Sequence, residues 1–183
     1  VGKNGSGKST LLDLITGVIQ PDKGEILVDK KNIKENLKNW EKKIIFLSQK
    51  NFFFESSILL NITLGENIDN VDKEKFLNCL KITNLNDTIE LLPNKEETII
   101  KSNNSNLSGG QQKKIQIARA FYQLNDEKKL IICDEPFENL DIESKEKFLD
   151  YLKKLKSKFT IILISHNKND LKFCDKLFDV NNI

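Results

Sequence analysis

Residues 2–10 read GKNGSGKST, which matches the Gly-x4-Gly-Lys-Ser pattern of a phosphate-binding loop. Glycines in such a loop let successive backbone N–H groups turn toward a phosphate without Cβ clashes. Lys8 is placed to reach the outer phosphates of a nucleotide, and the Ser9 hydroxyl is placed to bind Mg²⁺. Apolar residues continue at helical spacing, so we expect a helix over residues 8–18. The loop alone is compatible with kinases, GTPases, translocases and transporters.

Aliphatic segments that alternate with helical segments follow the loop. The expected strands lie at 24–29, 43–48, 130–133, 160–164 and near 176–180, and further helices are expected at 109–124 and 142–157. This alternation predicts an α/β fold of the P-loop NTPase type, with a mostly parallel sheet covered by helices on both faces. The stretch from residue 50 to 125 interrupts the alternation with short helical pieces. It is therefore expected to be an inserted, mostly helical subdomain.

The strand expected at 130–133 runs into two carboxylates, in the sequence LIICDEP. Buried strand residues would carry Asp134 to the edge of the sheet, where it is a candidate partner of Mg²⁺. Glu135 follows directly and points elsewhere, so it is a candidate general base for an attacking water molecule. Acidic residues also close strands without any catalytic role, and that is the alternative. The phosphate loop earlier in the chain favours the metal site.

His166 is the sole histidine and follows the aliphatic segment TIILI at 160–164. A solitary histidine is usually a surface or core residue without catalytic interest. However, the carboxyl ends of parallel strands gather at one edge of an α/β sheet, where active sites lie. We therefore expect the imidazole to contact the γ-phosphate or the attacking water.

Residues 106–114 read NLSGGQQKK and continue as the apolar, helically spaced IQIARAFYQL. A Ser-Gly-Gly turn that opens a helix leaves backbone N–H groups exposed at the positive end of the helix dipole. The turn is therefore a second candidate anion site, about a hundred residues after the first.

Composition narrows the classes of function. The formal net charge is +2 over 183 residues, which argues against a dedicated nucleic-acid surface. Three cysteines without metal-ligand spacing predict neither a zinc site nor a disulfide framework. No apolar run is long enough to span a bilayer, so any attachment to a membrane is expected to come from other segments or another chain. Methionine is absent, so we expect the sequence to be a fragment that begins after its natural start.

Three motifs occur in the order GKNGSGKST, LSGGQQKKIQIARA and LIICDEP, with Gln49 and His166 each following an expected strand. Together they make the chain resemble the ATP-binding cassette family, the nucleotide-binding domains of ABC transporters. The sequence LSGGQ between a P-loop and a DE strand is specific to this family, and the resemblance spans essentially the whole chain. It implies a RecA-like ATP-binding core at 1–49 and 126–183, lacking its N-terminal strands, and a helical subdomain with the signature motif at 50–125. It also implies a Mg²⁺-dependent ATPase.

The resemblance implies a role for each matching residue. ATP is expected to contact Gly2, Asn4, Gly5, Ser6, Gly7, Lys8, Ser9, Thr10 and Gln49; catalysis is implied for Glu135, His166 and Lys8, and Mg²⁺ binding for Ser9, Gln49 and Asp134. Cassettes of this family pair head-to-tail, so the ATP of a second cassette is expected to contact Ser108, Gly109, Gly110, Gln111 and Asp141. Transmembrane domains, fused or separate, are the other implied partners, which places the chain at the cytoplasmic face of a membrane. No nucleic acid is expected.

Segments 52–62 and 91–100 resemble those of exporters rather than importers. Some positions depart from the family pattern: Ser102 stands where exporters usually carry a coupling glutamate, and ENLD at 138–141 replaces the commoner Ser-Ala-Leu-Asp. The adenine-stacking aromatic lies upstream of the loop in this family, so we expect weak or no ATPase activity from these 183 residues alone. Two alternatives remain, a non-transport ABC ATPase that acts on ribosomes or DNA, and a degenerate cassette kept for structure or regulation.

Overall fold

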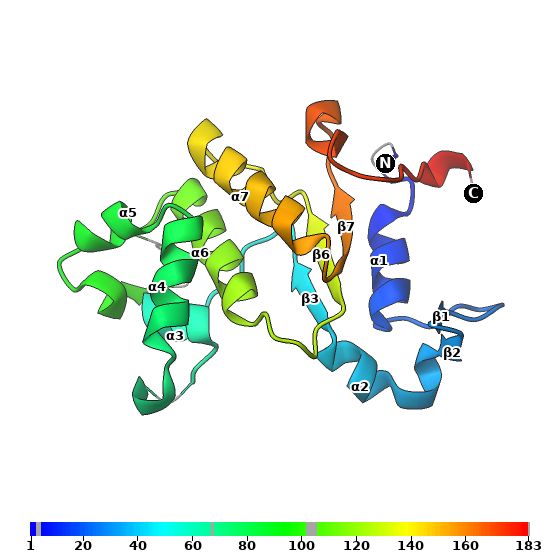
Figure 1. The fold of residues 1–183 in the computed structure, drawn as a ribbon, viewed down its shortest axis with the longest axis horizontal. Helices are drawn as coiled ribbons and strands as arrows, with labels where there is room; N and C mark the ends of the chain where they lie inside the picture. Colours follow the sequence, from blue (N-terminus) through cyan, green and yellow to red (C-terminus); the bar gives the residue numbers. More distant parts are fainter. Residues whose placement is uncertain (3–4, 67, 102–105, 183) are drawn as a thin grey trace.

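The computed structural model describes residues 1–2, 5–66, 68–101 and 106–182 (Figure 1). Its centre is a parallel three-stranded sheet with the order β3 (Ile44–Leu47), β6 (Leu130–Asp134) and β7 (Thr160–Ile164). In the register, Leu47 lies opposite Cys133, and Asp134 lies opposite Ile164. The expected parallel sheet is therefore confirmed for these three strands, which end at the same edge.

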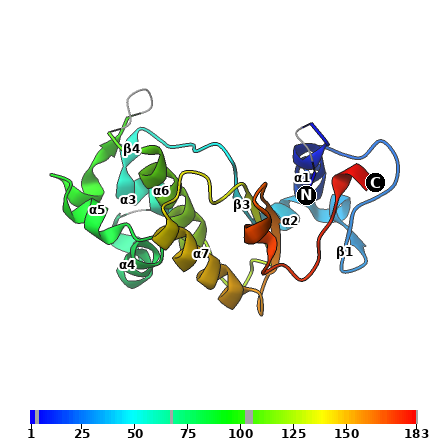
Figure 2. The ribbon, with the colours of Figure 1, turned by 90° about the horizontal axis from the view of Figure 1, so that it is seen from above.

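Helices surround the sheet. They are α1 (Lys8–Thr16), α2 (Leu37–Lys42), α3 (Ile58–Thr63), α4 (Lys73–Ile82), α5 (Asn86–Glu90), α6 (Gly109–Tyr122) and α7 (Ile142–Leu155). Of these, α1, α6 and α7 lie close to the predicted helices, whereas α2 was not predicted. Short 3₁₀ turns lie at Ile33–Asn36, Ile68–Asn70, Lys95–Glu97, Lys168–Leu171 and Val180–Asn182. Figures 1 and 2 show α1 on one side of the sheet and α6 and α7 on the other.

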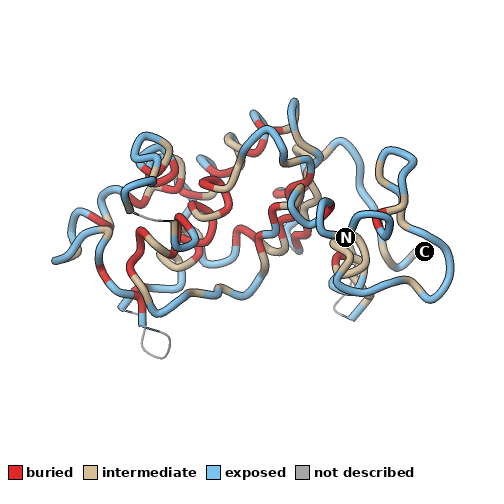
Figure 3. Tube along the Cα trace, turned by 90° about the horizontal axis from the view of Figure 1, so that it is seen from below, coloured by how far each residue is buried: buried red, intermediate tan, exposed pale blue. Residues whose placement is uncertain are grey.

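The central strand β6 is buried on both faces, which explains its continuous aliphatic sequence. Ile131 and Cys133 face a core shared with helices α3 to α7, whereas Leu130 and Ile132 face a smaller core. Leu12 of α1 and Trp40 of α2 contribute to the smaller core. Figure 3 shows the buried residues concentrated in the helical half and the sheet, and the end of the molecule around the two termini mostly exposed.

Two expected strands differ in the structure. The segment at 24–29 forms a strand only at Leu27–Val28 (β1), which pairs antiparallel with Lys31–Asn32 (β2) outside the parallel sheet. No strand forms near 176–180 among the described residues. The backbone of residues 176–180 bonds to Val1: Val1 N donates to Phe178 O, and Val180 N donates to Val1 O at 2.9 Å. Phe178 is also 69% exposed, so burial does not hold the segment in a sheet.

Residues 50–125 contain one feature that the sequence pattern did not predict. Ser56–Ser57 (β4) pairs antiparallel with Ile99–Ile100 (β5), and the pair brackets α3, α4 and α5. Each strand has only two residues, which is too short for a period-2 pattern to be visible. Over the ranges that the structure describes, no helix has the length and hydropathy required to cross a bilayer.

Candidate functional site

The carboxyl ends of the three parallel strands bring together residues that are far apart in the sequence. Strand β3 leads into Ser48 and Gln49, β6 ends at Asp134 and leads into Glu135, and β7 leads into Ser165 and His166. Because Asp134 and Ile164 are partners in the register, Glu135 and His166 emerge from neighbouring strands at the same level. The edge of the sheet therefore presents an amide, two carboxylates and an imidazole.

Glu135 and His166 contact each other directly. Nε2 of His166 lies 3.4 Å from Oε1 of Glu135, and the backbone N–H of His166 donates to Oε2 at 3.4 Å. Glu135 has a φ of 45°, in the left-handed region, and its own N–H donates to the carbonyl of Ile164 at 3.0 Å. This turn points the carboxylate back across the end of β7 toward the imidazole. The left-handed φ is a strained backbone conformation for a glutamate.

The environment of Glu135 keeps its carboxylate reactive. The side chain is 16% exposed, and Oε1 is shielded from solvent; the His166 imidazole lies 3.4 Å away, but no described residue makes a hydrogen bond to Oε1. Burial raises the pKa of Glu135 above its usual value, opposed by the charge and the backbone N–H of His166. A carboxylate with a raised pKa and an unbonded oxygen is suited to accept a proton.

Asp134 ends β6 at the same edge of the sheet. Burial raises its pKa, while the positive charges of Lys113, Lys8 and His166 act in the opposite direction. Lys8 is the first residue of α1 and its charge acts on Asp134, so the start of that helix lies near the edge of the sheet that carries the carboxylates. The structure thus brings the predicted phosphate loop and the predicted acidic pair together.

The loop before α1 has the backbone geometry of an anion site. Gly5 and Gly7 adopt φ values of 77° and 90°, in the left-handed region that favours glycine. Gly7 precedes α1 and has no side chain with which to cap it, and the start of a helix favours an anion. Lys8 Nζ donates to the carbonyl of Gly2 at 2.8 Å and so lies over the loop. A side chain at Gly2 would collide with Ser6 Oγ.

The remaining predicted residues of the loop are placed as follows. Ser6 Oγ is buried and lacks a hydrogen-bond partner among the described residues, as expected of a group that meets a ligand. Ser9 and Thr10 are exposed in the first turn of α1. Asn4, and also Ser102 at the expected coupling position, lie outside the described residues.

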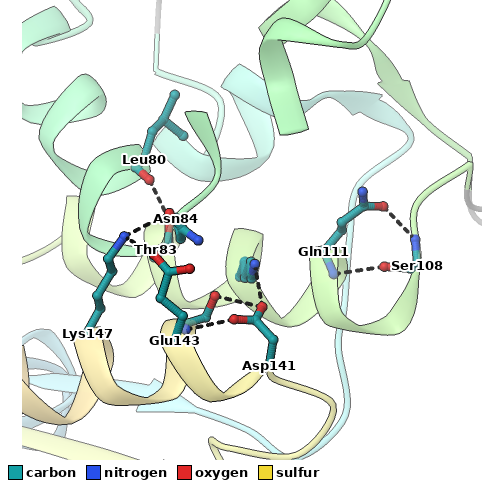
Figure 4. Close-up of polar contacts among 10 residues, drawn as sticks. Leu80, Thr83, Asn84, Ser108, Gln111, Asp141, Glu143 and Lys147 are labelled. Atoms are coloured by element: carbon teal, nitrogen blue, oxygen red, sulfur yellow. Dashed lines mark hydrogen bonds and ion pairs between the residues drawn. The ribbon is translucent and has the colours of Figure 1, made fainter. Parts of the chain in front are cut away.

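The second predicted anion site begins α6. Ser108 caps this helix and forms a capping box with Gln111: the Gln111 N–H donates to Ser108 Oγ at 3.3 Å, and the Ser108 N–H donates to Gln111 Oε1 at 2.8 Å (Figure 4). Gly109 and Gly110 fill the first turn, where the helix dipole favours an anion. A Cβ at Gly110 would lie 2.7 Å from the carbonyl oxygen of Asn139, so only glycine fits against that loop.

Asp141 lies beside this turn and begins α7. Its carboxylate accepts from the Ser144 N–H and from Ser144 Oγ, each at 2.8 Å, and pairs with Lys114 of α6 at 2.8 Å. Figure 4 shows the Asp141 and Ser108 caps on neighbouring helices. The Lys114 ammonium holds the pKa of Asp141 well below its usual range. The turn at Ser108 and the start of α7 at Asp141 therefore form one corner, joined by the ion pair between Lys114 and Asp141.

The two predicted anion sites do not meet within the chain. The loop of Gly2 to Thr10 leads into α1, and the turn of Ser108 to Gln111 begins α6, and these helices lie on opposite sides of the sheet (Figures 1 and 2). Glu135 and His166 belong with the first site, and Asp141 belongs with the second.

Two residues of α6 that the sequence pattern did not indicate as functional, Lys113 and Gln116, contact the backbone around Gln49. Lys113 is 1% exposed and Gln116 is 6% exposed, and both bond to the backbone that follows β3. Their spacing in the sequence indicates that they lie on the buried face of the helix, because Lys113, Gln116, Ile117 and Ala120 follow the i, i+3, i+4, i+7 pattern of one helix face.

Known proteins are similar to this chain over almost its whole length. The sequence model of the family described as "ABC transporter" matches residues 1–138. An ABC multidrug transporter, MDR2 of Trichophyton tonsurans, is 33% identical over 97% of this chain, and the ATP-dependent lipid A-core flippase of Haemophilus influenzae is 32% identical over 99%. A bacterial Atm1-family ABC exporter with ATP bound has a TM-score of 0.83 at 25% identity, over 93% of this chain. The chain spans 13%, 30% and 29% of the length of these three proteins, respectively.

Proposed function

The chain belongs to the ABC transporter family, and we propose that it is the ATP-binding and ATP-hydrolysing cassette of an exporter. The observation that carries this proposal is the contact between Glu135 and His166 at the carboxyl ends of the parallel strands. Lys8 and the glycine loop lie near the same edge of the sheet. A general base, an imidazole and a phosphate cradle at one edge are what hydrolysis of a nucleoside triphosphate requires. The similarity to a multidrug transporter, a flippase and an exporter supports transport over action on ribosomes or DNA.

The residues at the edge have the chemistry for ATP bound with Mg²⁺. The phosphates of ATP would lie on the N–H groups of the loop and the start of α1, in contact with Lys8 and with the unbonded Ser6 hydroxyl. The oxygens of Ser9, Asp134 and Gln49 are the hard ligands that Mg²⁺ prefers, and Mg²⁺ bound there would neutralise charge on the phosphates. Glu135 would take the proton of the attacking water through Oε1, and His166 would hold Glu135 and approach the γ-phosphate.

The separation of the two anion sites supports a shared active site between two cassettes. A head-to-tail pair would place the corner of Ser108, Gly109, Gly110, Gln111 and Asp141 over the ATP held by the loop of its partner. The open first turn of α6 would then add backbone N–H groups to the γ-phosphate from the opposite side. In this arrangement neither cassette alone completes an active site.

Coupling to a membrane is the remaining part of the proposal. Transmembrane domains, in the same or another polypeptide, would dock on the helical subdomain at 50–125, beside the core at 1–49 and 126–183. Phe52 and Phe54 stack edge to face there and are 66% and 49% exposed, which is an unusual exposure for aromatic rings and suits a protein partner. The chain would then lie at the cytoplasmic face of the membrane.

Two substitutions in the full-length protein that carries this chain test the assignment. Glu135→Gln keeps size and shape but cannot accept the proton, so it is expected to bind ATP and to lose turnover by about 10²–10⁴-fold. Lys8→Ala is expected to lose ATP binding, since it removes the charge that faces the phosphates. The measurements are ATP binding by equilibrium titration and phosphate release. Normal turnover in Glu135→Gln, or unchanged ATP affinity in Lys8→Ala, would contradict the proposed roles.

A further inference from the structure

Lys113 of α6 is one of the largest fully buried side chains among the described residues, with 1% of its surface exposed. Its ammonium is 3.3 Å from the carbonyl oxygen of Ser48, 3.1 Å from that of Gln49 and 3.1 Å from Oε1 of Gln116, and it donates to all three. These contacts match the three donors of an ammonium group. The lysine is therefore fully bonded to the segment after β3 and to its neighbour one turn along α6.

Gln116 completes the same arrangement. Its Nε2 donates to the carbonyl of Ser48 at 3.0 Å, to Ser48 Oγ at 3.1 Å and to the carbonyl of Lys50 at 3.2 Å. Ser48 Oγ itself donates to the Lys50 carbonyl at 2.8 Å. Two side chains from one face of α6 thus bind the carbonyls of three consecutive residues, 48–50, and we call this arrangement the α6 clamp.

Burying the charged Lys113 in the α6 clamp is unfavourable in free energy compared with burying an apolar side chain. Removing an ammonium from water is unfavourable, and burial lowers the pKa of Lys113, opposed by the nearby carboxylates of Glu138, Asp134 and Glu135. Neighbouring core positions of the same helix, such as Ile115 and Ile117, are filled by apolar residues that carry no such cost. The lysine instead bonds the carbonyls of Ser48 and Gln49, so its contribution is to fix that backbone.

We propose that Lys113 and Gln116 are positioning residues: they hold residues 48–50 so that the exposed Gln49 side chain faces the edge of the sheet. Through α6, they also link Gln49 to the turn of Ser108 to Gln111. This rests on the proposed function, in which Gln49 binds Mg²⁺ and Ser108 to Gln111 bind the ATP of a partner. Lys113 lies one helical turn after Gly109, so a shift of the first turn of α6 on docking moves the ammonium that holds Gln49. The Gln49 segment would thereby respond to the arrival of the second cassette.

The test uses Lys113→Met in the full-length protein, which keeps the length of the side chain and removes the charge and all three donors. Without nucleotide, amide hydrogen exchange over residues 48–51 is expected to rise by about tenfold, because a charge-assisted bond to the backbone is lost. With ATP, the Mg²⁺ concentration for half-maximal turnover is expected to rise about tenfold, while ATP binding without Mg²⁺ stays unchanged. Gln116→Leu is expected to shift both readouts in the same direction by a smaller factor.

Ile117→Val is the matched control, because it removes one methyl group from a side chain of α6 that is equally buried. It is expected to loosen the core slightly without changing exchange at 48–51 or the Mg²⁺ dependence. Should Lys113→Met fail to fold, Gln116→Leu carries the same test.

A double substitution separates positioning from a general structural role. If Lys113 acts through Gln49, then Lys113→Met combined with Gln49→Ala has the same Mg²⁺ dependence as Gln49→Ala alone. Multiplied effects, unchanged exchange at 48–51, or raised exchange without a shift in Mg²⁺ dependence would each overturn the inference. Because the exchange readout needs no nucleotide, it stays valid if ATP binding itself fails, and that failure would count against the proposed function instead.

Discussion

Gly109 and Gly110 are adjacent glycines in the first turn of α6, but they have different surroundings. A Cβ at Gly110 would lie 2.7 Å from the backbone oxygen of Asn139, whereas a Cβ at Gly109 would meet the Asn139 side chain at 3.8 Å, which is ordinary contact. Asn139 already adopts a left-handed φ of 63°, so its backbone has little freedom to move away. We therefore expect opposite outcomes for Gly110→Ala and Gly109→Ala.

The size of the difference follows from the two contacts. Both substitutions gain helix preference, worth up to about 1 kcal/mol. Only Gly110→Ala must push a backbone carbonyl aside, and overpacking of this kind costs about 1–3 kcal/mol. Gly110→Ala is therefore expected to be about 1–3 kcal/mol less stable than Gly109→Ala, and Gly109→Ala to be as stable as the parent chain or up to about 1 kcal/mol more stable.

Urea denaturation of residues 1–183 measures this difference. Trp40 is the sole tryptophan and is 8% exposed in the smaller core, so its fluorescence reports on the α1 side of the sheet, while far-ultraviolet circular dichroism reports on the helices. Coincident transitions from the two probes would justify a two-state free energy of unfolding. Equal stability of the two variants, or a greater loss in Gly109→Ala, would refute the close approach of α6 to Asn139.

Two further substitutions test charges near the site. Because burial raises the pKa of Glu135 above its usual 4.5, its ionised form opposes folding at neutral pH, so Glu135→Gln is expected to raise the melting temperature at pH 7. The folded state binds the proton of the Glu135 carboxyl more tightly than the unfolded state does. The higher melting temperature of Glu135→Gln should therefore disappear below pH 4.5, where Glu135 is protonated in both states. A difference in melting temperature that does not depend on pH would argue against a raised pKa of Glu135. Lys145→Met is expected to cost about 3 kcal/mol in urea denaturation, because it removes the ion-pair partner of the buried Asp170, which also accepts from Ser165 Oγ at 3.0 Å. Lys145→Met combined with Asp170→Leu should recover much of that loss, and a double variant as unstable as the single one would contradict the pairing.

The strands that the sequence predicted well have continuous apolar sequences. Residues 130–133 are buried in the central strand, and residues 161–164 of the adjacent strand are aliphatic and at least partly buried, so the pattern is visible without a structure. The segment at 176–180 carries Lys176 and Asp179 beside exposed apolar residues, and its conformation depends on which backbone lies next to it. Such pairing is a tertiary property that a local pattern does not contain.

The part of the site that the sequence could predict is the part in which the fold topology alone brings residues together. Parallel strands end at one edge, so the sequence was sufficient to expect Glu135 and His166 near each other, and the structure places them 3.4 Å apart. It did not reveal Lys113, because a lysine in a helix is normally read as a solvent-facing residue. Only its spacing from Gln116 and Ile117 indicates the buried face, and the backbone carbonyls that it binds lie 64 and 65 residues earlier in the chain.

The central claim is that the glycine loop of one chain and the turn at Ser108 of another bind the same ATP. Complementation tests it most directly, with Lys8→Ala in one copy of the full-length protein and Ser108→Arg in the other. Each variant alone lacks a functional element in both composite sites and is expected to be inactive. A mixed pair carries both defects in one site and neither in the other, so mixing the two variants is expected to restore ATP hydrolysis. Inactive mixtures that still form mixed pairs would show instead that both elements serve the ATP of their own chain.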